Sequence, residues 1–301
     1  MNDEYVIKDS DLVTVTEMGH IVEVQYMQKR NSKATIKKLD KNKYIDLKTG
    51  EIKDFQKVDN RSQLKKSLYD TFKRLRYLIN NNFSGCGNEL HVVLTYREHM
   101  TDTERLYDDF RKFMQRLRYH YRNVSSIEYI SVVEPMQDGR WHCHVLMRFD
   151  DLESIYIPNK FDECNNPIDA PLYELWRNGW VVIKSLRNID NIGAYLSAYL
   201  TDVELTDDNT DTLKPGMKVK IVDDKKFIKG GRLHFYPPGM NIYRKSDGIK
   251  PPERRKMKFR DIKNIVKDSA PHYTKTYNVK TDEFENVITY YQYNLKRDIS
   301  K

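Results

Sequence analysis

Cysteines are few in this sequence, and long apolar runs are missing. Its 301 residues include three cysteines, Cys86, Cys143 and Cys164, and no two of them form a Cys-x-x-Cys pair. An odd number without such a framework argues against a disulfide scaffold and indicates a reducing compartment. No stretch of about eighteen apolar residues occurs, and the polar start of the chain is unlike a signal peptide. We therefore expect a cytoplasmic protein with no membrane partner.

Two further absences limit the function. The sequence has no G-x-x-x-x-G-K-[ST] phosphate loop, so no intrinsic ATP-driven helicase is expected, and it has no Cys₂His₂ finger pattern. Positive charge, in contrast, is abundant, with a formal net charge of +8 and a pI near 9.1. This excess favours a polyanionic partner such as nucleic acid. The length is sufficient to bury a core in one or two domains.

A pair of histidines lies in a strand-like segment, Trp141–Phe149. On a strand, residues i and i+2 point to the same face, so His142 and His144 point together and Cys143 points the other way. Two adjacent imidazoles can bind one divalent cation. The alternative is that both are ordinary half-buried histidines.

An upstream carboxylate bears on this alternative. If residues 137–139 form a three-residue loop, Met136 pairs with Arg140, and Glu134 lies directly opposite His142. Glu134, His142 and His144 would then form one mixed site with open positions, which suits Mg²⁺ or Mn²⁺ better than structural zinc. A two-residue turn would shift the register by one and turn Glu134 to the wrong face.

Two tyrosines follow at helical spacing. Residues 188–203 predict a helix after a strand at 180–186, and Tyr195 and Tyr199 share one face of that helix because they are four residues apart. The alternative is that both are packing residues, since the chain contains 21 tyrosines. A metal site upstream favours a catalytic role.

The order of these motifs resembles that of the HUH endonucleases, in particular the rolling-circle replication initiators of small plasmids and single-stranded DNA phages. Residues 92–96 resemble the first motif, Glu134 to His144 the metal-binding second motif, and Tyr195 to Tyr199 the catalytic third motif. The resemblance covers roughly residues 88–205 and, more loosely, 232–252. Ala198 and Asp202 stand where the family often has a lysine three residues after a catalytic tyrosine.

The resemblance implies an enzyme that nicks and rejoins single-stranded DNA at an origin. A tyrosine would attack phosphorus with the help of Mg²⁺ or Mn²⁺, leaving a 5′-phosphotyrosine and a free 3′-OH. Tyr195 is assigned the first attack, because Ile192 to Tyr195 resembles the family's lead-in and Gly193 and Ala194 would let the helix lie close to the sheet. The implied partners are single-stranded and origin hairpin DNA, a host helicase and a host polymerase.

Other functions remain open. One is a transposase or relaxase of a mobile element, although family relaxases carry the tyrosine before the histidines, whereas here the histidines come first. The other is a non-enzymatic DNA-binding regulator. The sequence does not define the oligomeric state.

We predict an α+β fold with an antiparallel sheet flanked by helices and with extensions at both ends. Residues 1–87 are expected to form β-hairpins and a basic helix, 88–205 the nuclease core, and 206–301 a basic extension that contacts DNA. Six polar residues are predicted to contact DNA: Thr95, Arg97, Arg140, Lys184, Arg232 and Arg244.

Overall fold

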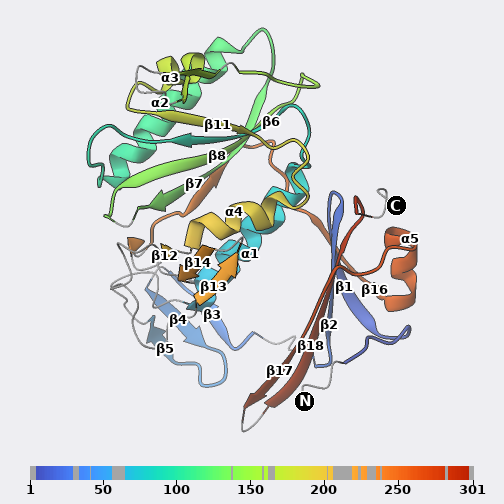
Figure 1. Ribbon diagram of the computed structural model, residues 1–301. Helices are drawn as coiled ribbons and strands as arrows, with labels where there is room; N and C mark the ends of the chain where they lie inside the picture. Colours follow the sequence, from blue (N-terminus) through green and yellow to red (C-terminus); the bar gives the residue numbers. More distant parts are fainter. Residues whose placement is uncertain are drawn as a thin grey trace. The chain divides into compact units, whose positions relative to one another are not determined.

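Two compact units divide the chain in the computed structural model (Figure 1). One unit joins residues 1–59 to 252–301, and the other spans residues 60–251. These divisions differ from the predicted boundaries after residues 87 and 205, so the three-part assignment of roles stays a prediction. The structure describes the following residues: 5–29, 34–40, 42–55, 65–136, 138–157, 159–161, 167–201, 203–205, 219–222, 225–228, 235–237, 239–281 and 284–297.

The larger unit is built on an antiparallel five-stranded sheet in the order β11-β6-β8-β7-β15. Its strands are β6 (Glu89–Leu94), β7 (Ile127–Pro135), β8 (Trp141–Phe149), β11 (Val181–Ser185) and β15 (Tyr243–Lys245). A short hairpin of β9 (Asn159–Phe161) and β10 (Pro167–Asp169) lies within a segment expected to be a loop. A three-stranded sheet contains β12 (Val203–Leu205), β13 (Val219–Val222) and β14 (Lys225–Ile228).

Helices cover both faces of the five-stranded sheet (Figure 1). On one side lie α2 (Thr103–His120) and α3 (Ala170–Trp176), and on the other α1 (Lys65–Asn82) and α4 (Ile192–Thr201). Helix α2 begins at Asp102, whose side chain accepts hydrogen bonds from the backbone N–H groups of Glu104 and Arg105. The apolar stripes of α1 and α2 pack into one core with the sheet, which confirms the predicted α+β class.

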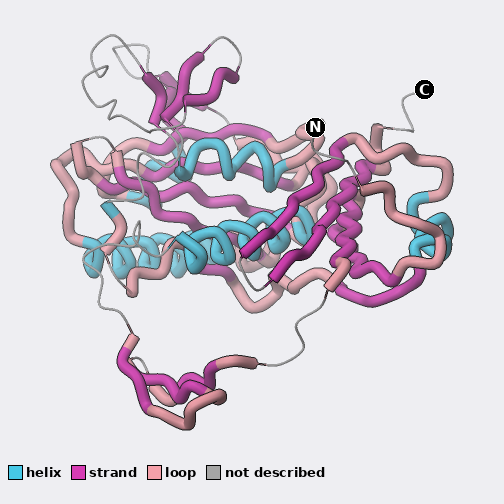
Figure 2. The backbone as a smooth tube through the Cα atoms, turned by 90° about the horizontal axis from the view of Figure 1, so that it is seen from below, coloured by secondary structure: helices cyan, strands magenta, loops and turns pink. Residues whose placement is uncertain are grey.

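The smaller unit has its own five-stranded antiparallel sheet, in the order β16-β1-β2-β18-β17. The strands are β1 (Leu12–Met18), β2 (Ile21–Met27), β16 (Glu253–Lys258), β17 (Tyr273–Thr281) and β18 (Phe284–Asn294). One face packs against the single turn η4 (Phe259–Ile262) and α5 (Lys263–Val266), as seen at one side of Figure 2. A separate small sheet contains β3 (Ile36–Lys38), β4 (Lys43–Asp46) and β5 (Ile52–Asp54).

Both ends of the sequence therefore contribute to one sheet, because β18 pairs with β2. The predicted basic extension, residues 206–301, is divided between the two units. Its first part, including the breaker-rich segment 206–216, lies outside the described residues. None of the helices in the described part of the chain has the length and apolar character needed to cross a membrane.

Candidate metal and nucleophile site

The hairpin of β7 and β8 sets the geometry of the site. The backbone N–H of Met136 donates to the carbonyl oxygen of Arg140 at 2.6 Å, which closes the loop 137–139. Gly139 has φ 83°, a left-handed conformation that glycine adopts without steric cost. In this register Glu134 lies directly opposite His142. The predicted three-residue loop is confirmed, and the two-residue alternative is wrong.

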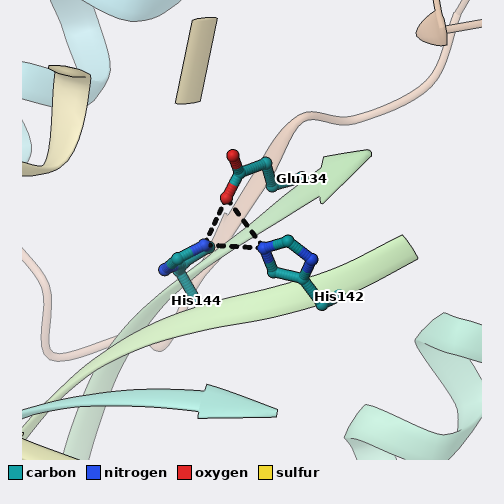
Figure 3. A group of neighbouring side chains, drawn as sticks. All are labelled: Glu134, His142 and His144. Carbon is teal, nitrogen blue, oxygen red and sulfur yellow. Dashed lines mark hydrogen bonds and ion pairs between the residues drawn. The ribbon is translucent and has the colours of Figure 1, made fainter. Parts of the chain in front are cut away.

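Three side chains converge on the face of the sheet that α1 and α4 cover (Figure 3). The Nε2 atom of His142 lies 2.8 Å from Oε2 of Glu134 and 3.0 Å from Nε2 of His144. His144 Nε2 also contacts the same carboxylate oxygen. All three residues are buried, with Glu134 exposed by 3%, His144 by 6% and His142 by 9%. Three potential ligand atoms therefore meet at one point.

The protonation of the two histidines suits a cation. Burial, with the charge of Arg140 as a smaller cause, lowers the pKa of His142 to about 4. Burial, with smaller effects of His142 and Lys184, also holds the pKa of His144 well below its usual range. Both imidazoles are therefore neutral near pH 7 and keep a lone pair for a metal. Two imidazole nitrogens and one carboxylate oxygen form a donor set that fits a divalent cation.

A third histidine, which the sequence analysis did not identify, lies behind this group. His91 on β6 is 2% exposed, and its Nε2 atom is 2.9 Å from Nδ1 of His144. If His144 presents its Nε2 lone pair to a metal, its proton sits on Nδ1 and donates to His91. Burial, followed by His144 and Lys184, lowers the pKa of His91 to about 3, so it stays a neutral acceptor. Its signal in the sequence was a polar residue inside the apolar strand 89–94.

Tyr195 lies next to His91. Their ring centroids are 5.9 Å apart and the rings are nearly perpendicular. Helix α4 begins after Asn191, whose side chain accepts from the backbone N–H of Ala194 at 3.0 Å. Tyr195 is thus in the first turn of α4, and His91 contacts both this ring and His144. Tyr199 lies four residues further along the helix, and its side chain is outside the described part of the chain.

The expected reason for the small residues before Tyr195 is wrong. Ala194 is exposed, and Gly193 faces α1 rather than the sheet. A Cβ atom on Gly193 would lie 2.6 Å from Oδ1 of Asn80 and 2.9 Å from the carbonyl oxygen of Arg76. The Gly193 N–H also donates to Asn80 at 2.8 Å. Gly193 therefore allows the close approach of α4 to α1, which fixes the first turn that carries Tyr195.

Two of the residues predicted to contact DNA lie near the three converging side chains. Lys184 on β11 pairs with His91 on β6, is exposed, and contributes to the lowered pKa of both His91 and His144. Arg140 lies at the hairpin turn, where its Nε atom forms an ion pair with Asp138 at 2.7 Å. Both add positive charge around the site.

The other predicted DNA contacts are not brought to the site. The Thr95 hydroxyl donates to the carbonyl oxygen of Trp180 at 3.0 Å, and the Arg97 guanidinium lies over the Tyr173 ring at 5.6 Å. Arg244 lies 3.7 Å over the ring of Tyr107 on α2, on the opposite side of the sheet. Arg232 lies outside the described residues.

Comparison with known proteins adds an independent finding. Residues 89–204 match the family model of the replication-associated proteins of the ORF2 and gene II protein type. The chain is also 27% identical over 157 residues to the Phasyl DNA replicon protein arp of Escherichia coli, an alignment that covers 46% of this chain and 52% of that protein. The chain thus spans about half the length of this curated relative. No solved structure matches. The segment from β6 to α4, which carries the site, is therefore the part similar to replication-associated proteins, and this similarity points to a role in DNA replication.

Proposed function

We propose that this chain initiates DNA replication by nicking and rejoining single-stranded DNA at an origin. The observation that carries the proposal is the convergence of Glu134, His142 and His144 on one sheet face, with His91 between His144 and Tyr195. A cation ligand set and a tyrosine hydroxyl are the two groups that a metal-assisted transesterification needs. The match of residues 89–204 to a replication-associated family supports the same interpretation.

In the proposed reaction, the Tyr195 hydroxyl loses its proton and its oxygen attacks the phosphorus of the scissile phosphodiester. An oxygen–phosphorus bond to tyrosine forms, the bond from phosphorus to the 3′ oxygen breaks, and that oxygen takes a proton. A bound Mg²⁺ or Mn²⁺ at Glu134, His142 and His144 supplies positive charge to a non-bridging phosphate oxygen. The 5′-phosphotyrosine retains the bond energy, so attack by a 3′-OH rejoins the strand without ATP.

The proposed partners follow from the products. A free 3′-OH can prime a host polymerase, and the strand must be unwound by a host helicase because the sequence has no phosphate loop of its own. Origin hairpin DNA would present the scissile bond in an unpaired strand, where it can reach the sheet surface. Tyr199 would perform the second transfer that ends a replication round.

A covalent capture experiment tests the proposal. The full chain is incubated with end-labelled random-sequence single-stranded oligonucleotides and Mn²⁺, and adducts are separated on a denaturing gel. We expect an adduct that disappears with chelator and with the double substitution His142→Ala/His144→Ala. Non-specific DNA binding should persist in that variant, because phosphate contacts by lysine and arginine supply it.

The matched control is His120→Ala, which removes an exposed histidine on α2 and should leave the adduct yield unchanged. Full nicking by the double variant in chelator would show that the three residues do not hold a catalytic metal. DNA binding without any adduct under all metal conditions would favour a non-enzymatic regulator.

A further inference from the structure

The second five-stranded sheet, β16-β1-β2-β18-β17, has one covered face and one face that is open over much of its width. On the covered face Val13, Val15, Val22 and Val24 are at most 1% exposed and pack with Ile262 and Val266 of the η4 and α5 turns. On the other face Tyr273 is 49% exposed and Tyr277 is 40% exposed. We call the latter the tyrosine–lysine face. It comprises Thr14, Gln25, Arg254, Lys256, Lys258, Tyr273, Lys275, Tyr277 and Tyr290.

The register aligns this face in rows across all five strands. Lys256 pairs with Thr14, Thr14 with Gln25, Gln25 with Tyr290, and Tyr290 with Lys275. Directly paired residues point to the same face of an antiparallel sheet. The cations of β16 therefore lie along one edge, and the tyrosines of β17 and β18 lie along the other.

The rings are held in place by neighbours on the same face. Gln25 Nε2 donates to the Tyr290 hydroxyl at 2.8 Å, and Arg254 donates to Gln25 Oε1 at 3.3 Å. The rings of Tyr277 and Tyr290 meet edge to face at 5.9 Å. The ammonium of Lys275 lies 4.6 Å from the centre of the Tyr277 ring. The aromatic groups are thus partly ordered before any ligand arrives.

The charge on this face has one sign. Arg254, Lys256 and Lys258 are exposed, and among the described strand residues only Glu23 adds a carboxylate to the face, where it is 5% exposed. No described carboxylate forms an ion pair with Lys256 or Lys258. On the covered face, in contrast, Arg255 of the same strand forms an ion pair with Glu17 at 2.6 Å. The positive edge is therefore available to an anionic ligand.

We propose that the tyrosine–lysine face binds single-stranded DNA, with bases stacked on the tyrosines of β17 and β18 and phosphates near the cations of β16. Exposed rings on a flat sheet accept the faces of unpaired bases, which a duplex hides, and basic side chains attract the backbone. The choice of DNA rests on the proposed function, whereas the face itself requires only an unpaired nucleic-acid strand. It is a binding site additional to the nuclease site, and it needs no metal.

The test measures DNA binding by the full chain in chelator, so that nicking does not take part. Anisotropy of a labelled oligothymidine about thirty nucleotides long should show about ten-fold weaker binding, or more, for Tyr273→Ala/Tyr277→Ala, because two stacking surfaces are removed. Tyr277→Phe keeps the ring and should bind like the unmodified chain. Two controls should do the same: Tyr156→Ala, which removes an 86% exposed ring from the other unit, and Thr274→Ala, which lies on β17 but faces the other way.

The cations are tested by salt dependence. Lys256→Ala/Lys258→Ala should reduce the slope of log affinity against log salt by about 0.7 for every phosphate that the variant no longer neutralises, whereas Lys280→Ala, on the covered side of β17, should not. These exposed lysines can be replaced without opening a core, so this arm holds even if the tyrosine variant folds poorly.

Photocross-linking locates the strand directly. An oligothymidine that contains iodouracil should cross-link to peptides that include residues 273–281 or 284–294. Cross-links restricted to residues 60–251, or tyrosine variants that bind within two-fold of the unmodified chain, would overturn the proposal. A change from dimer to monomer with unaltered DNA affinity would identify the face as a self-association surface instead. Loss of nicking with intact cross-linking would refute the proposed reaction and leave this site standing.

Discussion

The two faces of the sheet β11-β6-β8-β7-β15 bury side chains of opposite character to a similar degree. Towards α2 and α3, Val92, Leu94, Cys143 and Val145 are apolar and at most 2% exposed. Towards α1 and α4, a group of four ionisable residues is between 2% and 9% exposed: His91, Glu134, His142 and His144. The first face gains stability from burial, whereas the second must offset the desolvation of polar groups.

The polar face offsets that desolvation through a chain of contacts that runs from Glu134 through His144 to His91. Such a buried polar network is costly if one member is removed, and it holds the others in fixed orientations if it is complete. Strand alternation separates the two faces by a single residue, because Cys143 lies between His142 and His144 in sequence. The comparison therefore predicts that substitutions on one face alter chemistry and that those on the other alter stability.

The largest expected effect is loss of the nucleophile on the polar face. Tyr195→Phe should abolish the covalent DNA adduct, because no hydroxyl remains next to His91. Tyr199→Phe should retain the adduct and lose only a second transfer. The measurement is adduct yield on a denaturing gel with a labelled oligonucleotide recovered from the covalent capture. The reverse pattern would exchange the two roles, and loss of adduct only in the double variant would make the tyrosines interchangeable.

Removal of the carboxylate should have the next largest effect. Glu134→Ala takes away the oxygen on which both imidazoles converge, so we expect at least about a 100-fold loss of apparent Mn²⁺ affinity, measured by calorimetry. The matched control is Glu128→Gln on the same strand face, since Glu128 accepts a hydrogen bond from the Gly248 N–H at 3.0 Å. Equal loss in both variants would mean that Glu134 is not a ligand.

The part of this site that the sequence revealed is the part that local geometry determines. A short loop containing Gly139 and two alternating strands leave few registers, and only one of them places Glu134 opposite His142. The same reasoning located both tyrosines on one helix. It could not find His91, because β6 reaches β8 through a long connection and a lone histidine in a strand carries no signal of its neighbour.

Long-range pairing also explains what was not predicted in the fold. The pairing of β18 with β2 joins residues about 260 positions apart, such as Tyr290 and Gln25. Hydrophobic alternation predicts a strand but does not identify a distant partner, so the C-terminal segment was expected to be a separate extension. The role of Gly193 was misassigned for a similar reason, since its contact with Asn80 on α1 is a tertiary contact.

A smaller effect is expected from His91, which would position His144 without binding the metal. His91→Ala should lower nicking by about 10- to 100-fold, because His144 loses the acceptor of its Nδ1 proton. His91→Gln should restore much of this loss, since its amide oxygen can accept the same proton. Mn²⁺ affinity and the nicking rate are measured in parallel on both variants. If alanine leaves both quantities within two-fold of the unmodified chain, the hydrogen bond has no positioning role.

The smallest effect on chemistry is expected at Cys143, although this residue is adjacent to both histidines. Burial raises the pKa of its thiol to about 12, so the group stays protonated and cannot act as a thiolate ligand or nucleophile near pH 7. Cys143→Ala removes a buried sulfur atom and should lower the free energy of unfolding by about 1 kcal/mol. Nicking at a permissive temperature should be unchanged. Alkylation of the native chain followed by peptide mass spectrometry should modify the exposed Cys86 and leave Cys143 unmodified. Loss of nicking in a folded Cys143→Ala variant would contradict the separation of the two faces, because a residue pointing away from Glu134 would then take part in the chemistry.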